Sequence, residues 1–125
     1  MMRLILIMVC ACCLTACTLI TSEVVPTPEP PVVFVAPPNN QQVAAGAALT
    51  LDVVARSREV GVARVALYVD ETLLGEGTPP EGTVEVFRVT MQWNAQGAGF
   101  HSLSAQAFDA NGQPIGEALI VVEVI

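Results

Sequence analysis

The chain has 125 residues, of which 53% are hydrophobic and 14% charged, and its formal net charge is −7. This length holds one domain at most, since domains typically run to about 100–150 residues. Only five arginines, with no lysine, offset twelve Asp and Glu residues, so the clustered cations that neutralise phosphates are missing. Composition therefore argues against nucleic acid as a partner, and the valine, leucine and isoleucine content argues against disorder of the whole chain.

An apolar run of about a dozen residues, 4–14, follows a short cationic start. A membrane-spanning helix needs about 20 such residues, so the run has the length of a signal-peptide core. It ends in the tetrapeptide LTAC at 14–17, which is similar to the lipobox of bacterial lipoproteins, where cleavage precedes a cysteine that carries a diacylglyceryl group. The resemblance implies a leader over residues 1–16 and lipid on Cys17; an ordinary signal peptide cut at the same place is the alternative.

The positions of the four cysteines agree with this interpretation. Cys10, Cys12 and Cys13 lie inside the apolar run and would leave with the leader, so Cys17 alone would remain. The mature chain then has no internal disulfide, and a thiol consumed by lipid explains a single N-terminal cysteine. A metal site built from these cysteines is the competing hypothesis, which the apolar surroundings and the absence of a nearby histidine disfavour.

A proline-rich segment follows the predicted lipidation site. Pro26, Pro28, Pro30 and Pro31 favour extended polyproline geometry, and no periodic apolar pattern runs through residues 18–31. We predict a semi-rigid linker over residues 17–31 that leads into a domain over residues 32–125, although a disordered spacer predicts nearly the same behaviour. Residues 36–42 (APPNNQQ) form a second predicted break.

From residue 32 onward, apolar residues alternate with polar ones, which is typical of antiparallel strands with one buried face. The pattern predicts strands over residues 32–35, 49–53, 65–69, 87–93, 101–107 and 118–125. Six or seven short strands without a convincing helical period predict an all-β sandwich of about seven strands, large enough for one core. Predicted turns lie at Gly46, Gly61, Asp70-Glu71, 75–82, 94–99 and Asn111-Gly112, the last pair favouring a type I′ hairpin with positive φ at both residues.

Two stretches and one tryptophan resemble the bacterial Ig-like domains of cell-surface proteins. They are VARVALYVDETLLG at 62–75, Trp93, and GFHSLSAQAFDANG at 99–112, and the resemblance extends over about residues 32–125. Glu71 departs from the family, which often has glycine there. The family implies a structural or binding module without catalytic residues, so we expect no enzyme activity and no cofactor. The matching residues are Val65, Leu67, Tyr68, Val69, Asp70, Trp93, Gly99, His101, Leu103, Ala105, Ala107, Asp109 and Gly112.

His101 is the chain's one histidine and falls on the same predicted strand face as Leu103 and Ala105. We expect it at the edge of the core, with its ring nitrogens bonded to backbone or to a turn. Ser102 and Ser104 lie on the opposite face, so a Ser–His–acid arrangement cannot be assembled.

The acidic residues near predicted turns raise the question of calcium. Ca²⁺ takes six to eight oxygen ligands, and the DANG fragment at 109–112 lacks the remaining acids of a calcium loop. The other acids considered, Asp70, Glu71, Glu76 and Glu81, are spread over two turns. We expect no metal site, and we expect Asp109 to accept hydrogen bonds from turn amides.

Three aromatic residues are candidates for ligand contact. Trp93 shares a strand face with Phe87 and Met91, which predicts a core position rather than a sugar platform. Tyr68 and Phe108 fall on the outward phase of their strands. Together they could form an exposed aromatic pair that contacts sugar or peptide, or they could simply cover an alanine-rich sheet.

Strands that alternate in direction would sort the turns between two ends. The turns at 44–48, 70–72 and 94–99 would lie far from the linker, and those at 56–61, 75–82 and 111–116 would lie near it, unless an extra strand within 76–82 exchanges the later ones. Loops at one end of a sandwich are the usual place for recognition. The predicted partner contacts are therefore Asp70, Glu71, Asn94, Gln96, Tyr68 and Phe108, with Arg56 and Arg58 nearer the membrane.

These observations predict a non-catalytic, extracytoplasmic module of the cell envelope, lipid-anchored to membrane through Cys17. We expect a monomer that acts in adhesion or scaffolding by binding an envelope protein or a glycan. The alternatives are a small carbohydrate-binding domain and an inhibitor or accessory subunit of an exported enzyme.

Overall fold

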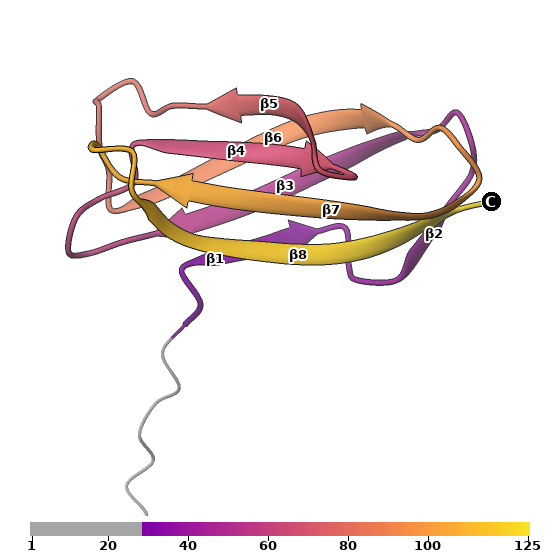
Figure 1. Cartoon of the computed structure of the whole chain (residues 1–125), viewed down its shortest axis with the longest axis horizontal. Helices are drawn as coiled ribbons and strands as arrows, with labels where there is room; N and C mark the ends of the chain where they lie inside the picture. Colours follow the sequence, from indigo (N-terminus) through magenta and orange to yellow (C-terminus); the bar gives the residue numbers. More distant parts are fainter. Residues whose placement is uncertain (1–28) are drawn as a thin grey trace, which may run out of the picture.

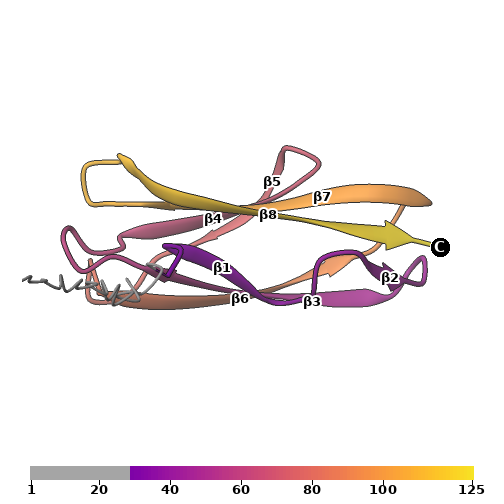
Figure 2. The ribbon, with the colours of Figure 1, turned by 90° about the horizontal axis from the view of Figure 1, so that it is seen from below.

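The computed structural model describes residues 29–125 (Figure 1). Eight strands form two sheets that lie face to face, as Figure 2 shows from below. The predicted leader, Cys17 and most of the predicted linker lie outside the described residues. No helix within residues 29–125 has the length and apolar character needed to cross a membrane.

The two sheets differ in size. One has three strands in the order β1-β3-β6, and the other has five in the order β2-β8-β7-β4-β5. Neighbouring strands are antiparallel, except that β2 runs parallel to β8. The strands are β1 (Val32–Ala36), β2 (Gln41–Val43), β3 (Ala48–Arg56), β4 (Arg64–Val69), β5 (Thr72–Gly77), β6 (Val86–Asn94), β7 (Gly99–Phe108) and β8 (Pro114–Val124).

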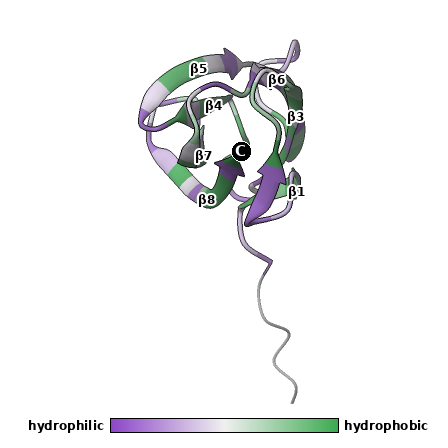
Figure 3. Ribbon diagram, turned by 90° about the vertical axis from the view of Figure 1, so that its right-hand side faces the viewer, coloured by the Kyte–Doolittle hydropathy of each residue, from purple (hydrophilic) through white to green (hydrophobic). Residues whose placement is uncertain are grey.

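The core lies between the two sheets. It consists of the alternate residues along the strands whose side chains face inward. Viewed along the strands, β4, β7 and β8 close one side of this core and β1, β3 and β6 close the other (Figure 3). The all-β sandwich predicted from the alternation is therefore confirmed. The core residues with at most 1% of their surface exposed include Leu51, Val53, Val65, Leu67, Leu103, Ala105, Ala107 and Val122.

Strand β2 occupies part of the predicted break at residues 36–42. After β1 the chain leaves the three-stranded sheet and pairs Gln41–Val43 with residues 122–124 of β8 in the other sheet. Three residues are too few to show a periodic pattern, which explains why the sequence does not reveal this strand. Similarly, β8 begins at Pro114 rather than at residue 118, beyond a register shift opposite Phe108.

Two glycines of the predicted turn at 75–82 belong to strand β5. A side chain at Gly75 would meet Met91 of β6, and one at Gly77 would meet Val89 of the same strand. These glycines therefore let β5 approach the side chains of β6 where the two sheets meet. Their function is close packing between the layers, and the connection to β6 follows only at residues 78–85.

The hairpin between β7 and β8 differs from the type I′ turn predicted for Asn111-Gly112. Gly112 has a φ of 79°, but Asn111 is not in the positive-φ region. The amide of Gly112 donates to the carbonyl of Asp109, and the amide of Asp109 donates to the carbonyl of Gln113. The loop is thus a longer hairpin in which one glycine takes the left-handed position. A type I′ geometry occurs instead between β4 and β5, where Asp70 and Glu71 have φ values of 49° and 69°.

The turns are distributed between the two ends of the sandwich as predicted. We call the end where residues 29–31 lead into β1 the proximal end and the opposite one the distal end. Residues 44–47, 70–71 and 95–98 connect strands at the distal end, and residues 57–63, 78–85 and 109–113 connect them at the proximal end. The additional strand β2 runs in the same direction as β1, so it does not exchange the ends of the later loops.

Residues 29–31, at the end of the predicted linker, are held against the proximal end. The amide of Arg56 donates to the carbonyl of Pro31 over 2.7 Å, and the Arg56 guanidinium contacts the Glu29 carboxylate at 2.5 Å. The ring of Pro31 lies over Gly116, where a Cβ atom would overlap it. Pro31 can therefore pack at this position only because residue 116 is a glycine and has no side chain.

We expect Gly116→Ala to displace Pro31 and to break the Arg56–Pro31 hydrogen bond. The loss should be about 0.5–1.5 kcal/mol of unfolding free energy, the usual net contribution of one such bond. Urea unfolding measures this loss, and the amide NMR signal of Arg56 should shift. Glu117→Ala, at the exposed neighbouring position, should leave that signal in place. Equal shifts in both variants would contradict the packing of Pro31 on Gly116.

Candidate functional site

The distal end is built around the tight turn between β4 and β5. The Val69↔Thr72 pair closes the turn, which leaves Asp70 and Glu71 as its two loop residues. The amide of Asp70 donates to the carbonyl of Ser102 over 2.8 Å, and the Asp70 carboxylate accepts the Ser102 amide over 2.9 Å. The turn is thereby fastened to β7, and Glu71 does not prevent it from being tight.

His101 joins this turn to a second loop. Its Nδ1 lies 2.5 Å from the Asp70 carboxylate, and its Nε2 lies 2.5 Å from the carbonyl oxygen of Gly97, between β6 and β7. The imidazole meets the Trp93 ring edge-on at a centroid distance of 5.4 Å, and only 16% of its side chain is exposed. The predictions of a core-edge histidine bonded to backbone and turn, and of Trp93 packed against the core, are both confirmed.

Asp70 and His101 each shift the pKa of the other. The hydrogen bond to Asp70 raises the pKa of His101 above its usual 6.5, and the Gly97 carbonyl adds to the shift. Partial burial acts to raise the pKa of the Asp70 carboxyl, but the hydrogen bonds from His101 and Ser102 outweigh it and hold that pKa below 3.8. Both shifts favour an ion pair of imidazolium and carboxylate.

The predicted contact residues divide into two groups at this end. Glu71, Asn94 and Gln96 are exposed, with Asn94 at the last position of β6. Asp70 also has an exposed side chain, but both of its carboxylate oxygens accept hydrogen bonds from β7. Asp70 therefore holds the distal end together, and the other three are exposed at the same end.

Tyr68 and Phe108 lie on the outer face of the five-stranded sheet, as their phase predicts, but they do not form a pair. Tyr68 is opposite Ser104 on β7, and Phe108 is four residues further along the same strand. At about 3.3 Å per residue the two positions are offset by about 13 Å along the strands, and they also lie on different strands. The guanidinium carbon of Arg64 lies 3.9 Å from the Phe108 ring centroid, so one aromatic face is already covered by a cation.

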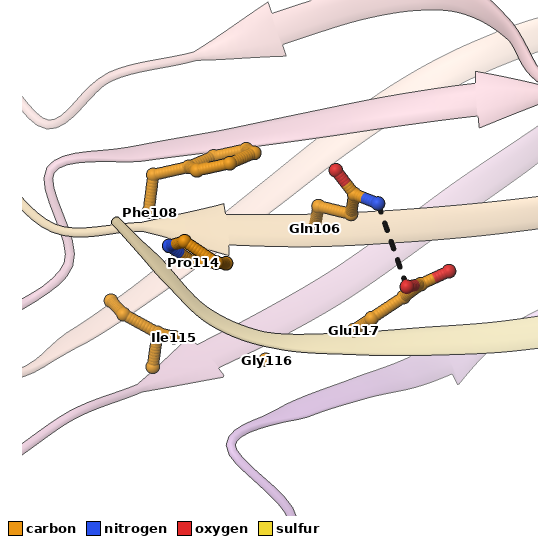
Figure 4. Close-up of a pocket in the computed structure, with 6 residues that line it drawn as sticks. All are labelled: Gln106, Phe108, Pro114, Ile115, Gly116 and Glu117. Atoms are coloured by element: carbon orange, nitrogen blue, oxygen red, sulfur yellow. Dashed lines mark hydrogen bonds between the residues drawn. The ribbon is translucent and has the colours of Figure 1, made fainter. Parts of the chain in front are cut away.

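A shallow, open depression of about 480 Å³ adjoins Phe108 near the proximal end of β7 and β8 (Figure 4). Its two polar side chains, Gln106 and Glu117, interact with each other at 3.5 Å. A sugar platform needs a free aromatic face beside available polar groups. Arg64 covers a face of the Phe108 ring, and Gln106 and Glu117 bind each other, so the depression meets neither condition. The lining residues are Gln106, Phe108, Pro114, Ile115, Gly116 and Glu117.

Asp109 acts within its own loop. Its carboxylate accepts the amides of Asn111 and Gln113, each at 2.9 Å, which confirms the predicted turn role. Within residues 29–125 the structure brings together no group of three or more His, Cys, Asp or Glu side chains suited to a metal ion.

The two arginines expected near the membrane lie at the proximal end. Arg56 pairs with Glu29, as described above, and Arg58 pairs with Glu85 at 3.2 Å. Each charge is thus partly balanced within the domain.

An ion pair on the outer face of the three-stranded sheet was not predicted from the sequence. Asp52, which is only 8% exposed, accepts two hydrogen bonds from Arg88, one of them from Nε over 2.8 Å. These bonds from Arg88 lower the pKa of the Asp52 carboxyl, against the opposing effect of its burial. The two residues stand on adjacent strands but 36 positions apart, so no local spacing signals their contact.

Two mostly antiparallel sheets packed face to face, with connecting loops at both ends, define an immunoglobulin-like β-sandwich. The chain belongs to the bacterial Ig domain family, whose sequence model matches residues 30–105. No curated protein matches the chain.

Solved structures share this fold. The fibronectin(III)-like modules of Clostridium thermocellum CbhA are 21% identical, with a TM-score of 0.58 over 74% of this chain and 94% of theirs. The CARDB domain of PF1109 from Pyrococcus furiosus is 17% identical, with a TM-score of 0.56 over 74% and 87%. A Thermotoga petrophila endo-beta-1,4-mannanase is 12% identical, with a TM-score of 0.58 over 84% of this chain but 21% of its own.

Family membership defines the general kind of protein. Domains of this type are typically non-catalytic and occur in bacterial proteins that are extracellular or on the cell surface. At these low identities the structural likenesses describe the fold alone.

Proposed function

We propose that this protein is a lipid-anchored module of the bacterial cell envelope that binds a protein partner through its distal end, as an adhesion or scaffold domain. The observation that carries the proposal is the joining of the β4–β5 turn and the β6–β7 loop by His101. A loop held in one conformation loses less entropy on binding than a free one. The same surface would serve an accessory subunit of an exported enzyme.

The attachment rests on the LTAC tetrapeptide at 14–17 and on the linker that follows it. At about 3.1 Å per residue in extended form, residues 17–31 reach about 45 Å. Since residues 29–31 enter at the proximal end, an anchor at Cys17 would leave the distal loops facing away from the membrane.

The exposed groups of the distal end can supply the polar and apolar contacts of a protein interface. Glu71, Asn94 and Gln96 are exposed there and carry one carboxylate and two amides, which hydrogen-bond to backbone and to basic side chains. Trp93 packs against the core and His101, and Phe100, at the second position of β7, is 71% exposed at the same end. A single exposed aromatic side chain among polar groups is typical of a protein interface. A carbohydrate-binding function finds no comparable support, because Tyr68 and Phe108 are separated.

Site-specific photo-crosslinking in intact cells tests the proposal. A photoreactive amino acid at Gln96 should give a discrete protein adduct, because this exposed residue lies in the β6–β7 loop. The matched control is Thr83, exposed in the proximal connection between β5 and β6. Adducts from position 83 with none from position 96 would overturn the assignment of the distal end.

A further inference from the structure

We propose that His101 is a pH-operated clamp that holds the β6–β7 loop to the β4–β5 turn only while its imidazole is protonated. Its effect on partner capture rests on the proposed function, whereas the clamp itself follows from the geometry of the distal end.

The argument starts from the donors and acceptors around the ring. A neutral imidazole has one N–H donor and one acceptor nitrogen, and only the imidazolium donates from both. The two groups at 2.5 Å from the ring nitrogens are the carboxylate of Asp70 and the carbonyl of Gly97. Both are pure acceptors, so the protonated ring satisfies both contacts and either neutral tautomer loses one of them.

The contact with Gly97 is the one that deprotonation should release. A remaining N–H favours the charged carboxylate over the neutral carbonyl. Asp70 is also held by Ser102, whose carbonyl accepts the Asp70 amide and whose amide donates to the Asp70 carboxylate. Ala95, at the start of the loop, is fixed by hydrogen bonds with Gly46 and Ala47. Residues 96–98, which are exposed, are therefore the segment that the clamp controls.

The surroundings of His101 contain few other titratable groups. The strand β6 presents Trp93, the β6–β7 loop has no charged residue between 95 and 98, and β8 places Val122 opposite His101. Glu123 follows on β8, but its carboxylate accepts a hydrogen bond from Gln42 of β2. Glu71 is exposed beside Asp70 in the turn, so Asp70 is the acid in direct contact with the ring.

The direction of the pH effect follows from the two pKa shifts. His101 has its pKa raised on folding, so its contribution is complete below the unfolded value of 6.5 and is lost as pH rises through the folded value. Asp70 has its pKa lowered, so its contribution is present above 3.8 and is lost as pH falls through the folded value. The clamp is closed at pH values between the two folded-state pKa values and opens as the pH rises above that of His101.

NMR on the full chain in detergent micelles, from pH 4 to pH 10, tests the clamp. The ring signal of His101 should titrate with a midpoint above 6.5, and the ¹⁵N order parameters of residues 96–98 should fall with the same midpoint. Asp70→Asn should lower the midpoint, and His101→Gln should abolish the pH dependence of the loop. Glu71→Gln, in the same turn but without contact to the ring, is the control and should change neither.

A midpoint at or below 6.5, or a loop equally ordered at pH 5 and pH 9, would overturn the clamp. Crosslinking from position 96 separates this result from the proposed function. Adducts of equal yield at pH 5.5 and pH 8.5 would support the partner and refute its control by His101. A normal His101 titration without any adduct would leave the clamp standing and refute the partner.

Discussion

Replacing Leu67 with alanine is expected to lower the unfolding free energy by about 2–5 kcal/mol, toward the upper part of that range. Leu67 is completely buried, and its neighbours across the sheet are Ala105 on β7 and Gly75 on β5. Neither is large enough to fill the space that the leucine leaves, so a cavity should persist. Domains of this size have only about 5–15 kcal/mol in total, which makes this loss a large fraction of the stability.

Urea unfolding of the full chain measures the effect of Leu67→Ala. Leu119→Ala is the matched control, because Leu119 is the same residue type in the same sheet but is 62% exposed. Its unfolding free energy should stay within about 0.5 kcal/mol of the wild-type value. Equal destabilisation by both substitutions would contradict the assignment of Leu67 to the core.

Replacing Cys17 with serine is expected to remove the protein from the membrane fraction. Each buried methylene of an acyl chain contributes about 0.8 kcal/mol, and stable attachment needs two or more chains, which a serine cannot carry through a thioether. The variant should accumulate either as an uncleaved precursor or as a soluble protein outside the cytoplasm.

Cell fractionation combined with intact mass measurement distinguishes these outcomes for Cys17→Ser. Cys10→Ser, inside the predicted leader, is the control and should give wild-type mass and membrane attachment. A serine variant at position 17 that reaches mature length and still sediments with membranes would refute the lipid anchor.

The sequence by itself determined the features of this protein that depend on neighbouring residues. Alternation of Val65, Leu67 and Val69 with polar or small residues predicted a strand with one buried face, because side chains of a strand point to opposite sides in turn. The bond from Asp109 to amides two and four positions ahead was predicted for the same local reason.

The tertiary structure decided the contacts between residues that are distant along the chain. The Asp70–His101 bond spans 31 positions, and β2 forms only because the β8 edge is there to receive three residues. Gly75 and Gly77 suggested a turn because glycine is common in turns. The β6 side chains that exclude a Cβ at those positions come close only in the folded structure. Local patterns reflect which face of a strand is buried, whereas register, strand order and loop contacts depend on the partner that each face meets.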